Sequence, residues 1–258
     1  MNDWDPENYS RYADERSRPY DELVRRIGAR RPERVADLGC GTGELTATLR
    51  RIWPTAEIVG VDSSPAMIAR ARTIKGIDDL RFLERDLSSW RPDHGTDVMI
   101  SNAALQWVPE HRQLLPGLVE RLSDDGWLAF QVPGNFDEPS HVLLRELADT
   151  APYADHTSDL ARPAAAEPAD YLADLAALGC TVDAWETTYL HVLAGDDPVF
   201  TWISATAARP ILQALPEDLR ETFVTEYKER LREAYPEQPY GTVLPFRRIF
   251  VVAHQAGS

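Results

Sequence analysis

The chain has 258 residues, 43% of them hydrophobic, and a formal net charge of −15 at pH 7. This length suits one sizeable core with elaborations, so we expect a single domain over residues 1–258. So acidic a chain disfavours contact with a phosphate backbone, and we expect no nucleic-acid partner. Its apolar runs are shorter than the ~20 residues of a membrane span, and residues 1–5 lack a signal-peptide pattern. We therefore expect a cytoplasmic protein without a membrane partner.

The chain contains two cysteines, Cys40 and Cys180. Two are too few for a disulfide framework, and neither belongs to a C-x-x-C or histidine cluster of the kind that binds zinc. We therefore expect no structural disulfide and no metal.

Strand and helix patterns alternate over the first half of the chain. Helical spacing at 21–29 precedes a strand at 34–37, a helix at 45–53, a strand at 57–62 and a helix at 64–75. Strands at 80–86 and 97–102 follow, then a helix at 109–122 and a fifth strand at 126–132. This alternation predicts an α/β fold with a parallel sheet, whose ligands bind beyond the carboxyl ends of the strands. Asp37, Asp62, Asp86 and Asn102 fall at such ends.

The second half breaks the alternation. Helical patterns are expected at 139–151, 171–178, 197–214 and 217–234, and strands at 181–193 and 247–254. The helical segments at about 139–170 and 196–242 exceed what a minimal alternating fold needs. We expect them to form a cap of insertions over the mouth of a pocket that binds the substrate.

The chain is organised around the stretch from Val35 to Glu44, VADLGCGTGE, where a strand turns through three glycines into a helix. Glycines allow a positive φ and a close ligand approach, and the helix that follows presents unpaired N–H groups. A dinucleotide fingerprint would read G-x-G-x-x-G, but the third glycine comes one residue early, at Gly43. Asp37 would oppose a pyrophosphate but suits a cationic ammonium. Asp62, at the end of the next strand, can accept both hydroxyls of a ribose.

A ribose, an ammonium and a carboxylate near a helix N-terminus describe S-adenosylmethionine. At these residues the chain resembles the class I S-adenosylmethionine-dependent methyltransferases, whose first motif reads like Asp37 to Gly43. That resemblance implies a seven-stranded, mostly parallel Rossmann-like methyltransferase sheet with helices on both faces and an antiparallel last strand between the fifth and sixth. The expected cofactor-binding residues are Asp37, Gly39, Cys40, Gly41, Gly43, Asp62, Ser63, Met67, Asp86, Leu87 and Asn102, with Asp86 and Leu87 at the adenine. Cys40 is expected there only as a small side chain.

Further segments are similar to one methyltransferase subfamily, the trans-aconitate 2-methyltransferases. They are the start 4–9 with 15–19, the run 60–69, the turn 104–107 and the late segment 202–210, in which Ala207-Ala208 departs from the expected pattern. The resemblance covers nearly the whole chain and implies esterification of trans-aconitate or a related polycarboxylate. The expected substrate-binding residues are Arg209, Arg16, Arg18, Gln106, Trp107, Arg247, Arg248 and Trp202.

The reaction sets what these residues must do. A carboxylate acceptor with a pKa near ~4 is already ionised at neutral pH, so no residue is required as an acid or base. The carboxylates that do not react need cations, best as bidentate arginine. Arg16 and Arg18 could equally be surface residues paired with neighbouring acids, and strand alternation sends only one of Arg247 and Arg248 inward. Tryptophans such as Trp107 and Trp202 are more often core residues than part of a cofactor wall.

Three alternatives to esterification stay open on the sequence. Another small oxygen, nitrogen or carbon nucleophile could be methylated. A sensor that binds the cofactor without catalysis would share the glycine motif, but nothing in the chain favours it. A nicotinamide-dependent oxidoreductase is opposed by Asp37 and by the early Gly43. The sequence leaves the oligomeric state undetermined.

Overall fold

The computed structural model describes residues 13–93 and 95–257, with side chains from Ser17 onward. The chain divides into two compact units. The first consists of the chain up to Val132, Ala165–Thr187 and the chain from Ile249 onward. The second consists of Pro133–Ala164 and Thr188–Arg248. The second unit overlaps the segments 139–170 and 196–242 expected to form a cap, and its role over a substrate stays a prediction.

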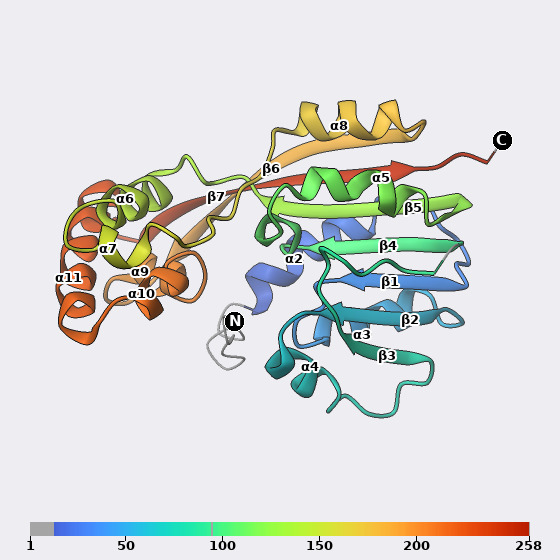
Figure 1. Cartoon of the computed structure of the whole chain (residues 1–258), viewed down its shortest axis with the longest axis horizontal. Coiled ribbons are helices and arrows are strands. Elements are labelled where there is room, and N and C mark those ends of the chain that lie inside the picture. Colours follow the sequence, from blue (N-terminus) through green and yellow to red (C-terminus); the bar gives the residue numbers. More distant parts are fainter. Residues whose placement is uncertain (1–12, 94, 258) are drawn as a thin grey trace. The chain divides into compact units, whose positions relative to one another are not determined.

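A seven-stranded sheet organises the first unit, in the order β3-β2-β1-β4-β5-β7-β6 (Figure 1). Its strands are β1 (Arg34–Leu38), β2 (Glu57–Asp62), β3 (Leu80–Glu84), β4 (Thr96–Asn102), β5 (Leu122–Pro133), β6 (Thr181–Leu193) and β7 (Thr242–His254). Strands β3, β2, β1, β4 and β5 pair in parallel. The N–H of Gln255 donates to the carbonyl of Gly126, and the N–H of Gly134 donates to the carbonyl of Arg247. Strand β7 therefore runs antiparallel to β5. The seven-stranded α/β fold with an antiparallel last strand is confirmed.

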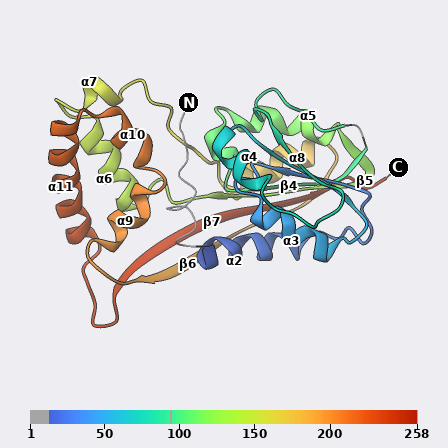
Figure 2. The ribbon, with the colours of Figure 1, turned by 90° about the horizontal axis from the view of Figure 1, so that it is seen from below.

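Helices cover both faces of this sheet. They are α2 (Ala13–Val24), α3 (Glu44–Ile52), α4 (Pro65–Ala71), the 3₁₀ turns η1 (Leu105–Trp107) and η2 (His111–Leu114), α5 (Leu115–Val119) and α8 (Pro168–Ala177). Figure 2 shows α2 and α3 on one face and α5 and α8 on the other. The main core lies between the sheet and the latter pair, where Leu118, Phe130 and Tyr171 are buried together. This burial of apolar surface is what holds the helices to the sheet.

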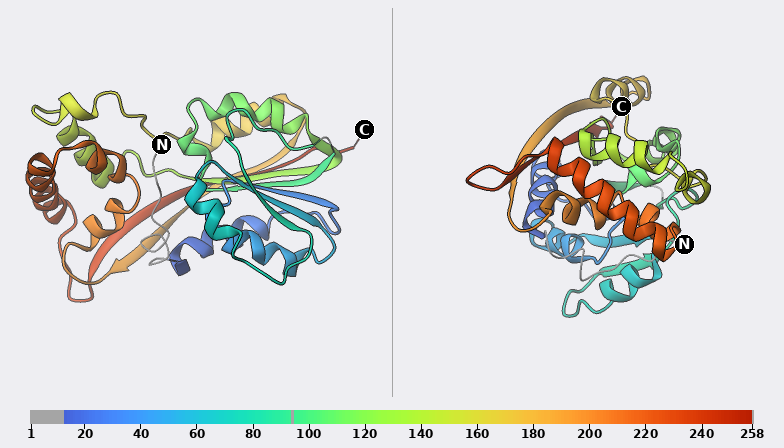
Figure 3. Two further views of the ribbon diagram at one scale, coloured as in Figure 1. Left: turned by 60° about the horizontal axis from the view of Figure 1, so that its bottom comes forward. Right: turned by 90° about the vertical axis from the view of Figure 1, so that its left-hand side faces the viewer.

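The second unit contains helices together with residues 188–193 of β6 and 242–248 of β7. Its helices are α6 (Pro139–Ala148), α7 (Ala154–Thr157), α9 (Pro198–Ser204), α10 (Arg209–Ala214) and α11 (Glu217–Ala234). Figure 3 shows α11, in orange, running beside α6. The buried Tyr227 hydroxyl donates to the carbonyl of Ser140 at 2.6 Å, and the N–H of Ser140 donates to the Tyr235 hydroxyl at 3.0 Å. These bonds fix the N-terminal turn of α6 against α11.

Several predicted boundaries are wrong. The first helix ends at Val24 rather than residue 29, and the helix expected at 109–122 is replaced by η2 and α5. The helix expected at 197–214 is divided into α9 and α10, because Pro210 has no N–H to donate to the carbonyl of Thr206 and its ring would clash there, whereas the first turn of a helix accepts proline. Strand β7 begins at Thr242 instead of residue 247.

Within the described residues, no helix has the length and apolar character needed to cross a membrane.

Candidate functional site

The glycine loop joins β1 to α3 through backbone hydrogen bonds to the neighbouring strand. The N–H groups of Gly39 and Cys40 both donate to the carbonyl of Val61 on β2, at 2.7 and 2.9 Å. The N–H of Gly43 then donates to the carbonyl of Cys40 at 3.0 Å, which closes the turn before the helix. All three glycines have positive φ, from +55° to +83°. The loop conformation is therefore one that other residues adopt only with strain.

The three glycines differ in what surrounds them. A Cβ at Gly39 would lie 2.1 Å from the Cβ of Ala104, and one at Gly43 would lie 2.6 Å from the ring of Phe82. At Gly41, no heavy atom of the described residues lies within 4 Å of that position. Gly39 and Gly43 thus allow close packing, whereas Gly41 faces open space that a ligand can enter.

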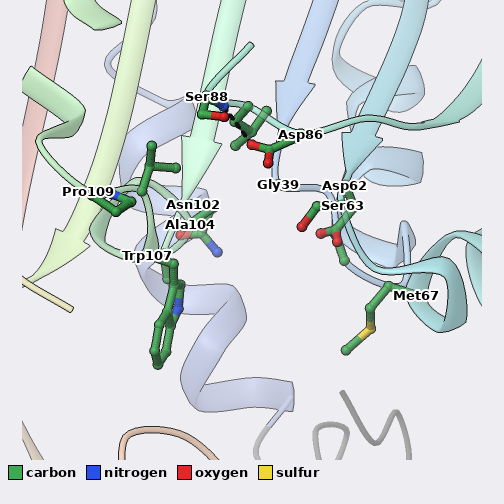
Figure 4. Close-up of a pocket in the computed structure, with 14 residues that line it drawn as sticks. Gly39, Asp62, Ser63, Met67, Asp86, Ser88, Asn102, Ala104, Trp107 and Pro109 are labelled. Atoms are coloured by element: carbon green, nitrogen blue, oxygen red, sulfur yellow. Dashed lines mark hydrogen bonds between the residues drawn. The ribbon is translucent and has the colours of Figure 1, made fainter. Parts of the chain in front are cut away.

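A pocket of about 300 Å³ opens beside this loop, at the carboxyl ends of the parallel strands (Figure 4). It is lined by Gly39, Gly41, Asp62, Ser63, Met67, Asp86, Leu87, Ser88, Asn102, Ala103, Ala104, Trp107, Val108 and Pro109. Eight of the residues predicted to bind the cofactor are among them. The other three, Asp37, Cys40 and Gly43, do not line the pocket.

Asp62 has the geometry of a carboxylate prepared for a ligand. Its Oδ2 accepts the N–H of Gly41 at 3.0 Å, and its Oδ1 accepts the N–H of Ser64 at 2.8 Å. Burial raises the pKa of Asp62, while the backbone N–H groups of Ser64, Gly41 and Ser63 oppose that rise. Each oxygen keeps lone-pair capacity for one more donor, which suits two adjacent hydroxyls.

Asp37 is a buried carboxyl at the end of β1, with 2% of its surface exposed. Its Oδ2 accepts the hydroxyl of Thr46 at 2.6 Å. Burial, above all, raises the pKa of Asp37 to about 7, with a smaller contribution from the charge of Asp62 and opposition from the Thr46 bond. A cation bound nearby would favour the ionised form of Asp37.

Cys40 packs into a small cluster with Ile68, Ala71 and Phe82 rather than into the pocket. Burial raises the pKa of its thiol well above its usual range, with further contributions from Asp37 and Asp62. The thiol is therefore held protonated, which fits a small packing residue better than a nucleophile.

Asp86, Asn102 and Trp107 also line the pocket (Figure 4). Oδ1 of Asp86 accepts the N–H of Ser88 at 2.8 Å, so its second oxygen can accept from a ligand. Oδ1 of Asn102 accepts from Nε2 of Gln131 at 2.8 Å, and this bond fixes the orientation of the Asn102 amide. Ser88, Ala103, Ala104, Val108 and Pro109 line the pocket as well and are not among the residues expected from the sequence, although Ala104 belongs to the turn at 104–107 that carries the resemblance.

Two predicted substrate residues of the first unit differ in placement. Trp107 lines the pocket, but Gln106 is buried and donates from Nε2 to the carbonyl of Ala103 at 2.7 Å. Arg18 lies exposed on α2, and the side chain of Arg16 lies outside the described residues, as do residues 4–9 of the subfamily pattern.

The remaining predicted substrate residues belong to the second unit. Arg209 begins α10, and Trp202 is buried in α9 with its ring 4.7 Å from that of His191. Arg247 donates from Nη1 to the carbonyl of Gly134 at 3.3 Å. Arg248 is buried, with its guanidinium 4.5 Å from the centre of the Phe246 ring.

The strand order, the glycine loop and an acid at the end of β2 together define the class of S-adenosylmethionine-dependent methyltransferases. The comparisons with known proteins agree, because the family described as "Methyltransferase domain" matches residues 12–165. Trans-aconitate 2-methyltransferase from Streptomyces avermitilis is 50% identical, covering 98% of this chain and 97% of that protein. The enzyme of that name from Mycobacterium tuberculosis is 46% identical, covering 99% and 98%. The chain belongs to the trans-aconitate 2-methyltransferase family.

Solved structures share the fold at low identity. The YcgJ protein from Bacillus subtilis has a TM-score of 0.62 at 16% identity, covering 94% of this chain and 100% of that one. A methyltransferase-like protein from Bacillus halodurans has a TM-score of 0.60 at 15% identity, covering 92% and 98%. These likenesses establish the fold, and the family membership establishes S-adenosylmethionine as the cofactor.

Proposed function

We propose that this protein methylates a carboxylate of trans-aconitate to a methyl ester, with S-adenosylmethionine as the donor. The observation that carries the substrate is the 46% to 50% identity to proteins bearing that activity in their names, over nearly the whole chain. A cytoplasmic location, and a small molecule rather than nucleic acid or membrane as the target, belong to the same proposal.

The pocket beside the glycine loop fits the cofactor. Asp62 would accept the two ribose hydroxyls, Asp86 the adenine amino group, and Asp37 would face the methionine ammonium through its negative charge. The contacts of the pocket would be completed by Gly39, Gly41, Ser63, Met67, Leu87 and Asn102. This assignment is supported by the open space at Gly41 and by the two backbone bonds that orient the Asp62 carboxylate.

When bound, S-adenosylmethionine supplies a methyl group on a sulfonium ion. An ionised acceptor carboxylate would take that methyl group directly, with the cofactor sulfur as the leaving group. No proton moves, so the protein need only place the acceptor oxygen in line, and such placement is worth an effective molarity of ~10⁵ to 10⁸ M. Wall residues such as Trp107 would restrict the position of the acceptor and exclude water from the reaction centre.

The carboxylates that do not react need a cationic clamp in a protein of net charge −15. We propose that Arg209 is the principal clamp, with Arg16, Arg18, Arg247 and Arg248 as further candidates and Trp202 beside them. Arginine matches a carboxylate with two parallel N–H groups and stays charged at every working pH. A lysine at position 209 should therefore not replace it.

The proposal is tested by labelled methyl transfer to a panel of di- and tricarboxylates, followed by kinetics of Arg209→Ala and Arg209→Lys. Both variants should raise KM and lower kcat for trans-aconitate and leave cofactor affinity unchanged. Arg232→Ala is the matched control, because Arg232 is an exposed arginine of the same unit that pairs with Asp197. Wild-type turnover by Arg209→Ala would make Arg209 an ordinary residue of α10. Absence of ester formation from every carboxylate would overturn the substrate class and favour another small nucleophile or a cofactor-binding protein without catalysis.

A further inference from the structure

A second cavity lies within the second unit. It has a volume of about 50 Å³ and is bordered by α6, by the segment 157–163 and by α10. Every residue that lines it belongs to Pro133–Ala164 or Thr188–Arg248, and none of them lines the pocket beside the glycine loop. The cavity is therefore a separate site, which the assignment of the cofactor pocket leaves unexplained.

The walls of this cavity are mainly apolar. Leu144 and Ala148 of α6 are buried, whereas Pro210 and Ile211 of α10 are only half-buried. Among the described residues, α10 contributes no buried side chain, although its sequence RPILQA is largely apolar. An apolar helix face that borders a cavity is stabilised when a ligand covers it, because the ligand removes apolar surface from water.

Two polar side chains of the lining are uncharged at neutral pH. The Thr157 hydroxyl donates to the carbonyl of Ala148 at 2.8 Å and is thereby engaged within the fold. Burial lowers the pKa of His141 to about 4, with a smaller contribution from the charge of Arg145, and Nδ1 of His141 lies 3.1 Å from Oγ of Ser140. A buried water needs about two to four polar partners, and this lining offers few. The interior therefore favours a hydrocarbon group.

Two arginines give the cavity a cationic margin. Both Nη atoms of Arg162 bond the Asp149 carboxylate, so this charge is largely neutralised. Arg145 differs, because Nη1 donates to the carbonyl of Phe136 and its ion-pair partner Asp137 lies 3.9 Å away with a fully exposed side chain. Exposed pairs of this kind are weak. Arg145 thus keeps a positive charge beside the apolar walls.

The volume of the cavity sets the size of its occupant. A cavity of about 150 Å³ holds a benzene ring, so about 50 Å³ leaves room for a chain of roughly two or three carbons. The charge of Arg145 favours an anionic head on that chain, and a carboxylate matches the geometry of a guanidinium. The lining therefore fits a small molecule with an apolar tail and a carboxylate at one end.

We propose that this cavity binds a short-chain monocarboxylate such as butyrate. The hydrocarbon tail fills the space between α6 and α10, and the carboxylate accepts N–H groups of Arg145. The bound acid packs α10 onto α6 and so orders a helix that buries no side chain of its own. The proposal does not depend on methyl transfer, because this cavity shares no lining residue with the cofactor pocket.

Calorimetric titration of the full chain with butyrate, acetate and butylamine tests the required chemistry. Each buried CH₂ strengthens binding roughly fourfold, so butyrate should bind about 15-fold more tightly than acetate. Butylamine has the chain but the opposite charge and should not bind. Hydrogen exchange of the amides of Leu212 and Leu215, which bond to carbonyls one turn earlier, should slow when butyrate is present.

Two substitutions remove the charge and the space separately. Arg145→Met keeps an apolar stem and removes the guanidinium, so it should weaken butyrate binding at least about tenfold. Ala207→Leu fills the cavity and should abolish binding. Arg220→Met is the matched control, because Arg220 of the same unit also donates to a backbone carbonyl, that of Leu215, and pairs with the exposed Glu217. It should leave butyrate affinity unchanged, and the Tm of each variant shows whether it folds.

Several results would overturn the proposal. They are the absence of saturable butyrate binding by the wild type, equal affinity for acetate and butyrate, and unchanged butyrate affinity in both Arg145→Met and Ala207→Leu. Loss of binding in Arg209→Ala with full binding in Arg145→Met would instead assign the acid to the proposed substrate clamp. Should Arg145→Met fail to fold, Ala207→Leu alone decides. Butyrate binding is measured without S-adenosylmethionine, so a failure to form any ester would leave this proposal standing.

Discussion

Cofactor affinity should depend on pH through Asp37. This carboxyl is 2% exposed, and burial raises its pKa to about 7 in the ligand-free protein. Below that pH it carries a proton, and a neutral carboxyl attracts the methionine ammonium far less than a carboxylate does. Cofactor binding must then release the proton, so its affinity is linked to pH.

The magnitude follows from one proton released per cofactor bound. Below pH 7 each pH unit should weaken binding about tenfold, or about 1.4 kcal/mol, and above pH 7 the affinity should level off. Between pH 5 and pH 7 the total change is therefore about 100-fold. The hydrogen bond from Thr46 favours the ionised form, so Thr46→Val should move the onset to higher pH.

Isothermal titration calorimetry between pH 5 and 7.5, in buffers of different ionisation enthalpy, measures both affinity and proton release. 5′-Methylthioadenosine, which lacks the ammonium, is the ligand control, and Asp37→Asn is the protein control. Both should show flat profiles. A pH-independent affinity for S-adenosylmethionine in the wild type, or an equal slope for methylthioadenosine, would refute the link to Asp37.

The remaining predictions concern stability, the pocket and the thiol. Folding raises the Asp37 pKa, so the free energy of unfolding of the ligand-free protein should fall as pH rises from about 4 to about 7, by up to ~1.4 kcal/mol per pH unit. Denaturant titrations measure this dependence on pH, and Asp37→Asn should remove it. Asp62→Ala should weaken cofactor binding by ~1.5 to 3 kcal/mol or more in calorimetry, since it removes the ribose acceptor and releases the N–H of Gly41; unchanged affinity contradicts the assignment. Gly39→Ala should impair cofactor binding and lower the Tm, because its Cβ would meet Ala104 at 2.1 Å; wild-type values would show that the loop relaxes freely. Cys40 should react with a thiol reagent at pH 8 only on unfolding, and fast labelling of the native protein would disprove its burial.

Much of the pocket could be predicted because parallel strands bring their carboxyl ends to one edge of a sheet. Asp62, Asp86 and Asn102 follow from that rule and from the alternation of strands with helices. The rule does not tell which members of a loop face the ligand. The ring of Phe82 leaves no room for a Cβ at Gly43, and the Cβ of Ala104 leaves none at Gly39. Both neighbours are distant in the sequence. Spacing and the family resemblance place Cys40 and Gly43 at the cofactor; neither lines the pocket, and their contact with the cofactor stays a prediction.

The second unit was harder to predict. Its helices follow no alternation with strands, and the division between α9 and α10 depends on one proline whose effect the helical pattern concealed. Gln106 stands in the turn at 104–107 that carries the resemblance, but its amide is buried and donates to the carbonyl of Ala103 instead of lining the pocket. Such information is tertiary and is absent from residue types and spacing.

The place of β7 between β5 and β6 has a consequence for synthesis on the ribosome. Strand β6 is complete by Leu193, but its neighbour in the sheet, β7 (Thr242–His254), is synthesised only after α9, α10 and α11. Until β7 emerges, β6 has no partner and the edge of β5 stays open. The sheet can therefore close only once β7 has left the ribosome, and the exposed edges of a nascent chain are sites of mispairing. Truncation of the last strand should leave a protein that aggregates rather than a smaller enzyme.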